Sequence, residues 1–173
     1  MKPVYNREGR QDRRMTENER RGRVTELIRR HGDMIYRLAY QNTGSVHDAE
    51  DILQDTALAM LTKDAPLEDD ERIRYWLVRV TLNKCHNLMH AGHRRMNVPL
   101  SDAVQLYAPE DESILDEVMS LPPKYRSVIY LYYYEGYSIA EIADLLQSRP
   151  STVGSWLNRA RKRLRLRLEE QED

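Results

Sequence analysis

The stretch Tyr137–Arg167 reads YSIAEIADLLQSRPSTVGSWLNRARKRLRLR, and it predicts two short helices around a tight turn. Apolar residues recur at helical spacing on both sides of the break at Gln147–Pro150. Pro150 suits the first turn of the second helix, where a backbone N–H is not needed. The apolar positions are Ile139, Ile142, Ala143, Leu145 and Leu146 before the break and Val153, Leu157, Ala160 and Leu164 after it.

Charge is distributed unevenly over this stretch. The second helix contains no acidic residue from Arg149 to Arg167, and its second half is dense in arginine and lysine. A helix–turn–helix with a basic second helix is typical of proteins that read the DNA major groove. On pattern alone, an ordinary helical hairpin with a solvated basic face stays open as an alternative.

Composition limits the classes of protein to which the chain can belong. Its 173 residues form one domain or two small ones, and 32% charged with 40% hydrophobic residues is typical of a soluble globular protein. The single cysteine, Cys85, excludes an internal disulfide and fits a reducing compartment. No apolar run approaches the ~20 residues that span a bilayer, and the polar N-terminus does not resemble a signal peptide. We expect a cytoplasmic protein without membrane insertion.

The scarcity of turn and strand signals predicts an all-α fold. Glycine and proline number 7 each, and no alternating valine- or isoleucine-rich runs occur. The net charge is −1, so any affinity for nucleic acid must come from segregated charges. We predict two small helical domains joined by a linker, the second ending in the helix–turn–helix. The predicted ranges are a disordered basic tail at 1–21, a first domain at 22–96, an acidic linker at 97–112 and a second domain at 113–170.

Two predicted helices of the first domain carry contrasting charge. The helix from Val46 to Thr62, with Ser45 as its N-cap, has acidic residues on the face opposite its apolar side, and Leu61 belongs to the apolar side that is expected to point inward. The helix that starts near Arg72 contains no acid, and it places Asn83 and Asn87 one turn apart. Amides beside cations are suited to reading base edges. Plain solvated surface is the alternative for both faces.

Four segments in this order resemble a known family. They are DAEDILQDT at Asp48–Thr56, WLVRVTLNKCHNL at Trp76–Leu88, LPPKYRSVIYLYYYEGYSIAEIADLL at Leu121–Leu146 and STVGSWLNRARKRLR at Ser151–Arg165. The chain resembles bacterial RNA polymerase sigma factors of the extracytoplasmic-function (ECF) group, which contain only regions two and four. The resemblance covers about residues 22–168.

The resemblance implies that the acidic helix docks on core RNA polymerase. In the family this segment binds the clamp helices of the largest catalytic subunit, and complementary charge steers such association. The resemblance also implies promoter DNA and an anti-sigma factor as partners, although nothing in the sequence itself points to the latter. The matching polymerase-binding positions are Asp48, Asp51, Gln54 and Asp55.

The resemblance further implies two promoter contacts. The third helix would read the −10 element, with a flipped base gripped by the loop Lys63–Glu71, and the helix–turn–helix would read the −35 element. Gly154 and Trp156 depart from the residues that relatives commonly carry at these positions. The expected −10 residues are Arg79, Asn83, Lys84 and Asn87, and the expected −35 residues are Arg149, Thr152, Ser155, Trp156, Arg159, Arg161, Lys162 and Arg163.

Other functions fit the sequence less well. The histidines near Cys85 (His86, His90 and His93) include an i, i+4 pair, but their basic neighbours oppose a cation, so we predict no metal and no cofactor. No HExxH, GxSxG or glycine-rich phosphate loop occurs, so we do not expect an enzyme. The main alternative is a stand-alone helix–turn–helix regulator that binds DNA as a dimer. We predict a sigma subunit that binds core RNA polymerase, recognises −10 and −35 DNA and promotes transcription initiation.

The tyrosines of Tyr130–Tyr137 allow two interpretations. They resemble a base-stacking platform, but their spacing surrounds the helix, which favours core packing with solvated hydroxyls. Trp76 lies at an apolar spacing and is expected in the core.

Overall fold

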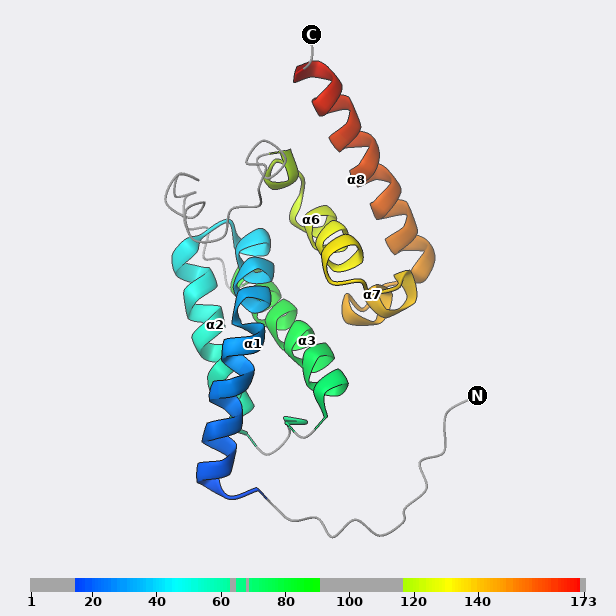
Figure 1. Ribbon diagram of the computed structural model, residues 1–173. Coiled ribbons are helices and arrows are strands. Elements are labelled where there is room, and N and C mark those ends of the chain that lie inside the picture. The colour runs from blue at the N-terminus through cyan, green and yellow to red at the C-terminus, as the bar shows by residue number, and fades with distance from the viewer. Residues whose placement is uncertain (1–14, 63–64, 68, 91–116, 172–173) are drawn as a thin grey trace, which may run out of the picture.

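The computed structural model describes residues 15–62, 65–67, 69–90 and 117–171, and the regular elements in these ranges are all helices (Figure 1). This confirms the all-α prediction. The predicted linker at 97–112 lies outside the described residues. None of the described helices is both long and apolar enough to cross a membrane.

Helix α1, Glu17–Thr43, starts inside the range predicted to be a disordered tail. The reason is a capping box: the Thr16 side chain accepts from the Glu19 backbone N–H at 3.2 Å, while the Glu19 carboxylate accepts from the Thr16 N–H at 2.8 Å. Arg20, in the first turns, donates to the carbonyl of Thr62 at 2.5 Å and so contacts the end of the next helix. The helix ends at Gly44, whose φ of 68° is readily adopted only by glycine.

Helices α2, Val46–Met60, and α3, Asp70–His90, pack against α1 to form the first domain (Figure 1). Ser45 caps α2 as predicted, accepting from the Asp48 N–H at 3.2 Å. Apolar residues at helical spacing meet between the three helices and exclude water. The largest fully buried apolar side chains of this domain are Leu27, Ile35, Leu38, Met60, Ile73, Leu77 and Val78.

The second domain contains α6, Pro123–Ile129, a π-helical segment η2, Tyr130–Tyr134, and the helix–turn–helix of α7, Ile139–Leu145, and α8, Pro150–Gln171. Val128, Leu131, Ile142, Val153 and Leu157 form its core, each at most 1% exposed.

The tyrosine cluster is divided between the core and the surface. Tyr130 and Tyr137 are buried as predicted, but Tyr133 and Tyr134 are 54% and 63% exposed. Core packing was therefore the wrong prediction for these two, which lie on the solvent side of η2, where the Tyr133 hydroxyl accepts a hydrogen bond from Arg161 of α8. Trp76 is half-buried against the core.

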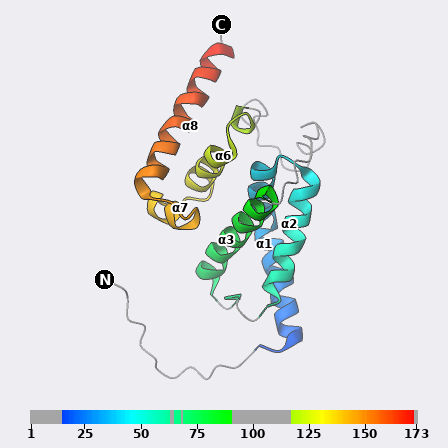
Figure 2. The same cartoon turned by 180° about the vertical axis from the view of Figure 1, so that it is seen from behind.

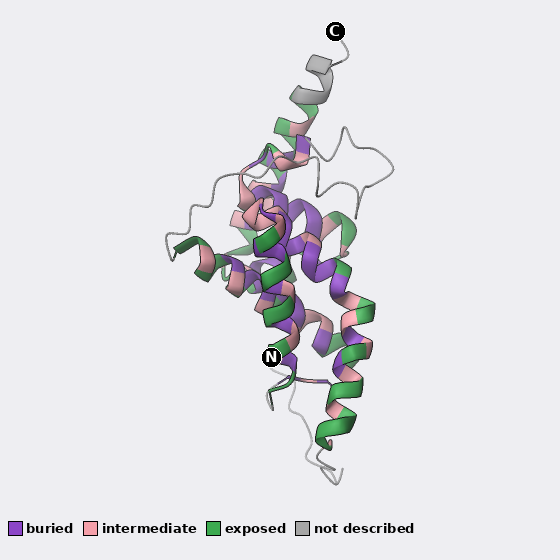
Figure 3. Ribbon diagram, turned by 90° about the vertical axis from the view of Figure 1, so that its left-hand side faces the viewer, coloured by how far each residue is buried: buried purple, intermediate pink, exposed green. Residues whose placement is uncertain are grey.

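The two domains contact each other directly. Helix α6 packs on α1 and α7 touches α3, as both views of the ribbon show (Figures 1 and 2). Buried residues gather where the helices meet, and exposed residues cover the outward faces, among them the first turns of α1 (Figure 3). Most of the buried apolar residues of the two domains belong to one contiguous cluster, and a smaller second cluster lies in the first domain.

Candidate polymerase and nucleic-acid interfaces

Helix α2 presents most of the predicted docking residues to solvent. Asp51, Gln54 and Asp55 are exposed at i, i+3 and i+4 on one face. Asp48 is different, since it is only 8% exposed beneath the N-cap of α2. Three of the four predicted residues thus share a surface, and Asp48 contributes little area to it.

The same face continues into an apolar patch that the sequence analysis missed. Leu58, one turn after Gln54, is 63% exposed, and Leu61 is 40% exposed although it was predicted to point inward. A large aliphatic side chain at the edge of a charged face is a common feature of interfaces that exclude water at their centre. The i+4 spacing from Gln54 to Leu58 was the signal that could have revealed it.

A few side chains at the start of α2 are of the types that can ligate a metal ion. In the part of the chain that the structure describes, only His47, Asp48 and Asp51 bring three such donors within 4.8 Å of one another. The His47 Nδ1 already pairs with Asp51 at 3.1 Å. Exposed acidic groups at this spacing commonly occur without an ion, so we assign no metal to them.

The histidines near Cys85, for which no metal was predicted, include a pair of rings in contact. His86 and His90 bring their Nε2 atoms to 2.9 Å on the exposed side of α3. Cys85 is buried, which raises the pKa of its thiol to about 12. Cys85 therefore cannot join the histidines, and His93 lies outside the described residues.

Helix α3 exposes a polar stripe along its length. Arg79, Asn83 and Asn87 are exposed at i, i+4 and i+8, so they share one face as predicted. Lys84 leaves this stripe, because its ammonium pairs with Asp55 of α2 at 3.4 Å. Two residues predicted for different partners, DNA and polymerase, thus contact each other.

A cavity of about 340 Å³ lies at the start of this stripe. Two aromatic side chains of α3, Tyr75 and Trp76, line it together with basic and loop residues. This volume is at the lower end of those typical for small-ligand pockets. The sequence analysis missed Tyr75, which precedes Arg79 by one helical turn. The remaining lining residues are Pro66, Glu71, Arg72 and Arg79.

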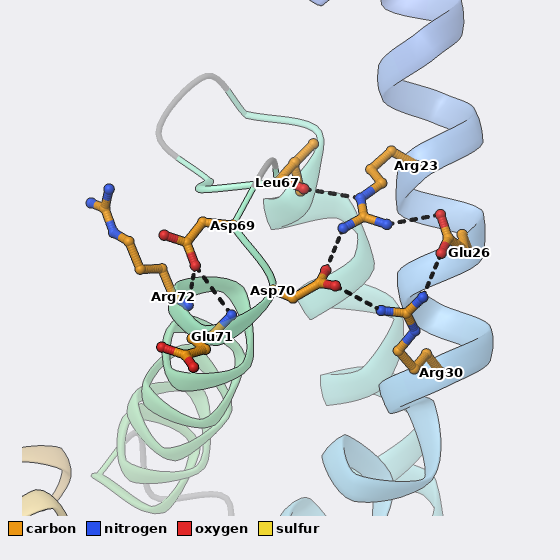
Figure 4. Close-up of polar contacts among 8 residues, drawn as sticks. All are labelled: Arg23, Glu26, Arg30, Leu67, Asp69, Asp70, Glu71 and Arg72. Carbon is orange, nitrogen blue, oxygen red and sulfur yellow. Dashed lines mark hydrogen bonds and ion pairs between the residues drawn. The ribbon is translucent and has the colours of Figure 1, made fainter. Parts of the chain in front are cut away.

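The loop beside the cavity is fastened to α1 by an arginine-centred network (Figure 4). Arg23 donates from Nε to the Leu67 carbonyl at 2.9 Å and pairs with Glu26 at 2.8 Å and with Asp70 at 2.5 Å. Arg30 closes the ring, at 2.7 Å from Glu26 and 3.2 Å from Asp70. The hydrogen bonds from Arg23 lower the pKa of both carboxyl groups, which keeps them ionised.

The first turn of α3 is held in the same region. The Asp69 carboxylate accepts from the backbone N–H groups of Glu71 at 3.1 Å and Arg72 at 3.0 Å (Figure 4). These bonds satisfy free N–H groups at the helix start. Arg72, which lines the cavity, therefore lies in a turn whose backbone is held by hydrogen bonds.

The helix–turn–helix forms at the predicted place. Ser138 and Glu141 make a capping box at the start of α7, with bonds of 3.3 Å and 2.8 Å. The turn passes through Gln147 at a φ of 50°, and Pro150 starts α8. The result is a long basic helix lying across α6 and α7.

The predicted −35 residues divide into two groups. Arg149, Ser155, Arg159 and Lys162 are exposed, and Thr152 is half-buried beside them. Helical spacing places these five along one side of α8. Two further predicted residues, Arg161 and Arg163, have tyrosine partners. The Arg161 Nε donates to the Tyr133 hydroxyl at 2.6 Å, and the Arg163 guanidinium lies 5.3 Å from the Tyr125 ring centre.

The two positions that depart from the family pattern have different surroundings. Trp156 is half-buried against the core, and the Lys124 ammonium lies 5.5 Å from its ring centre. Such a cation–π contact occupies one side of the ring. A Cβ added at Gly154 would meet nothing within 4 Å. The chain itself therefore gives no steric reason for glycine at this position.

Comparison with protein families identifies the two domains. The model described as "Sigma-70 region 2" matches residues 27–95, and that described as "Sigma-70, region 4" matches residues 111–164. ECF RNA polymerase sigma factor SigM of Mycobacterium tuberculosis is 31% identical over 147 residues, covering 80% of this chain and 74% of SigM. The chain belongs to the ECF group of RNA polymerase sigma factors.

Further relatives agree with this assignment. SigE of Mycolicibacterium smegmatis is 33% identical over 153 residues, and the match spans 81% of this sigma factor but only 59% of SigE. SigW of Bacillus subtilis is 28% identical, with 79% of this chain and 83% of SigW covered. The family comprises promoter-recognising subunits, so a stand-alone dimeric regulator is not favoured.

Solved structures share the fold. The sigma factor RpoE of Bartonella quintana, in complex with the anti-sigma factor NepR, has a TM-score of 0.69 at 20% identity over 84% of this chain and 96% of that one. CnrH, in complex with the cytosolic domain of CnrY, has a TM-score of 0.62 at 24% identity over 89% of this chain and 95% of that one. At these identities the likeness establishes the two-domain helical fold.

The family matches coincide with the interfaces built above. Region 2 of this sigma factor contains the α2 face, the α3 stripe and the cavity, and region 4 contains the helix–turn–helix. Each predicted surface therefore lies within a family-matched region.

Proposed function

We propose that this sigma factor docks on core RNA polymerase through the exposed side of α2. Asp51, Gln54 and Asp55 supply acidic and polar groups that steer a basic partner. Leu58 supplies an apolar anchor, and anchors of this kind contribute most to affinity when they are fully covered. Asp48 acts within the N-terminal turn of α2 rather than as a contact.

We further propose that α3 reads the −10 element. Arg79, Asn83 and Asn87 offer a cation and two amides on one exposed stripe, and amides of this kind bind base edges in single strands. The adjoining cavity, with Tyr75 and Trp76 in its wall, is suited to stacking on an unstacked base. This combination of stripe and cavity on one helix is the observation that carries the proposal.

The −35 element would be read by α8. Thr152, Ser155 and Arg159 lie on the side of α8 that a major groove would receive, and Arg149 and Lys162 extend it toward the phosphates. Arg161 and Arg163 contact tyrosines of the same domain, so they would help to hold α8 in place in addition to any contact with phosphate. Trp156, half-buried against the core with the Lys124 ammonium over its ring, would support α8 from within the domain.

The subunit would act without catalysing a reaction. Binding to polymerase and to the −35 element would offset the cost of unstacking DNA at −10. An anti-sigma factor is proposed as a further partner, because the sigma factor RpoE of Bartonella quintana, which shares the fold, was solved in complex with the anti-sigma factor NepR.

In vitro transcription with purified core polymerase tests the proposal. Run-off transcripts from genomic fragments should appear only when this protein is added. Asp51→Arg should abolish polymerase binding, because it reverses the charge at the centre of the α2 face. Asp33→Arg is the matched control: Asp33 is also an exposed helical aspartate, but it lies on α1 outside that face. A chain that binds no polymerase and instead dimerises on palindromic DNA would contradict the proposal.

The −10 assignment has a separate test. Asn83→Ala should leave polymerase binding intact and reduce promoter opening, measured by permanganate reactivity of unpaired thymines. A pre-opened template should restore transcription if Asn83 acts during opening. Unchanged transcription from linear duplex templates would show that the α3 stripe is assigned wrongly.

A further inference from the structure

Two arginines of α1 hold the segment between α2 and α3 at its two ends. Arg20 donates to the Thr62 carbonyl at 2.5 Å, just after α2, and Arg23 donates from Nε to the Leu67 carbonyl at 2.9 Å, shortly before α3. The two arginines lie about one helical turn apart on α1. The position of this segment therefore depends on side chains from an earlier helix, and not only on α2 and α3.

The three nitrogen atoms of the Arg23 guanidinium each have a partner (Figure 4). Nε binds the Leu67 carbonyl, Nη1 lies 2.8 Å from the Glu26 carboxylate, and Nη2 lies 2.5 Å from the Asp70 carboxylate. Because the guanidinium is planar and rigid, three partners fix its orientation. The Arg23 side chain is 21% exposed, so it is better shielded from water than a typical surface cation. Arg23 thus sets the Leu67 backbone and the Asp70 side chain relative to each other.

The groups that Arg23 holds lie next to the cavity on α3. Pro66, the neighbour of Leu67, lines the cavity from the loop, and Glu71, the neighbour of Asp70, lines it from the first turn of α3. Ala65 and Leu67 are buried at 7% and 2% exposed, and the Leu67 N–H donates to the Ala65 carbonyl at 2.9 Å. The loop wall of the cavity is therefore a short, hydrogen-bonded stretch that α1 fastens from behind.

The same contacts draw acidic charge away from the proposed DNA surface. The segment 64–71 carries five acidic residues, and acidic side chains repel DNA phosphates. Asp70 pairs with Arg23 at 2.5 Å and with Arg30 at 3.2 Å. The Asp69 carboxylate accepts from two backbone N–H groups at the start of α3. These two carboxylates are thereby directed to α1 and to the helix start.

We propose that Arg23 is a positioning residue for promoter capture, which fixes the loop wall of the cavity in the shape that receives an unstacked base of the −10 strand. This inference rests on the proposed −10 role of α3. Arg23 acts through Leu67 and Asp70, since it is not among the residues that line the cavity. A wall that is already ordered does not have to lose conformational freedom when the base binds, so the base binds more tightly.

A purely structural role for Arg23 has a different consequence. Loss of an ion pair that only stabilises the first domain should weaken binding to every part of the promoter to a similar extent. Loss of a positioning residue should affect the captured base more than its neighbours. The decisive quantity is therefore the energetic coupling between Arg23 and a single base, which a double-mutant cycle measures.

Abasic sites in forked DNA measure this coupling. The fork is built from a promoter mapped by the run-off assay, with the −10 non-template strand unpaired, and one base of that strand is removed at a time. For holoenzyme with the unaltered chain, removing the captured base should weaken binding about tenfold, because stacking on an aromatic side chain is lost. Holoenzyme with Arg23→Gln should bind the intact fork about three- to tenfold more weakly, and removal of the same base should then cost little more.

Three further variants control for charge and folding. Arg21→Gln changes the net charge equally, but the Arg21 side chain is 67% exposed and pairs with Glu17 of its own helix, so it should behave like the unaltered chain. Arg30→Gln removes one partner of Asp70 and leaves the Leu67 carbonyl held, so its effect should be smaller than that of Arg23→Gln. Arg23→Lys keeps the charge, but one ammonium cannot replace the planar fork. It should lose most of the coupling while polymerase binding stays intact.

Each outcome decides between the hypotheses. An equal penalty for removing the captured base in Arg23→Gln, Arg23→Lys and the unaltered chain overturns the positioning role. A uniform loss of affinity for all forks and for a duplex that carries the −35 element alone overturns it as well. Failure of the proposed function would appear in the unaltered chain itself, as run-off transcripts that are absent or as forks in which no −10 base matters, and the inference would fall with it.

Discussion

Thr56→Val should stabilise the protein, because it removes a buried hydroxyl that has no partner. Thr56 lies on α2 with 0% of its surface exposed, and its Oγ1 makes no hydrogen bond within the described residues. Valine has nearly the same shape and a similar helix propensity. The exchange therefore changes little except the desolvated oxygen.

The expected change in the free energy of unfolding follows from comparing Thr56 with a matched threonine in the same domain. Thr81 on α3 is also 0% exposed, but its hydroxyl donates to the Leu77 carbonyl at 2.8 Å. A buried unsatisfied hydroxyl costs about 1–3 kcal/mol, whereas a satisfied one contributes about 0.5–1.5 kcal/mol. Thr56→Val should thus raise the free energy of unfolding by about 1–2 kcal/mol, while Thr81→Val should leave it unchanged or lower it. For a chain of this length, 1 kcal/mol corresponds to a shift of about 2–4 °C in Tm.

Urea denaturation followed by circular dichroism measures the difference. The midpoint should rise for Thr56→Val at an unchanged m value, because the surface exposed on unfolding is the same. Transcription activity should be retained, since the exposed face of α2 is untouched. A Thr56→Val protein that is no more stable than Thr81→Val would refute the reasoning that the hydroxyl is unsatisfied.

Three further predictions concern single side chains. Burial, reinforced by the charges of Arg30 and Arg74, lowers the pKa of His31. The unfolded state therefore binds more protons than the native state, and the free energy of unfolding should fall as the pH drops below about 6.5. Urea titrations at several pH values should show a smaller fall for His31→Gln. Cys85, buried and with its pKa raised to about 12, should react with a thiol reagent only after unfolding, and rapid labelling of the native protein would contradict its burial. Leu58→Asp should weaken polymerase binding about tenfold or more with little loss of stability, since Leu58 is 63% exposed. Equal binding of the variant and the unaltered chain in a pull-down or by calorimetry would exclude an apolar anchor at this position.

The sequence predicted those local features that depend on interactions between residues close together in the chain. The helix–turn–helix followed from apolar spacing and from Pro150, and the start of α2 followed from Ser45. These signals act within one or two turns, so they persist in the folded protein. Thr16 and Glu19 carried an equally local signal, and overlooking that capping box led to the wrong start for α1.

The sequence analysis did not anticipate side-chain orientations that depend on a neighbouring helix. Asp48 lies beneath the N-cap, Leu61 points outward, and Lys84 turns to Asp55. Periodicity places each residue on a helix, but it does not say which neighbour covers that face. Trp156 shows the same limit, because its half-buried environment depends on Lys124 from a different helix.

The sequence by itself determined the all-α class, the order of the two regions and the helix–turn–helix at the C-terminal end. These depend on apolar periodicity, capping and motif order, which are properties of neighbouring residues. Only the tertiary structure decided that Tyr75 lines a cavity and that Arg74 and Tyr75 meet Glu135 and Asp144. Those contacts join residues about 60–70 positions apart, and pairing at such a separation depends on how whole helices pack rather than on any local pattern.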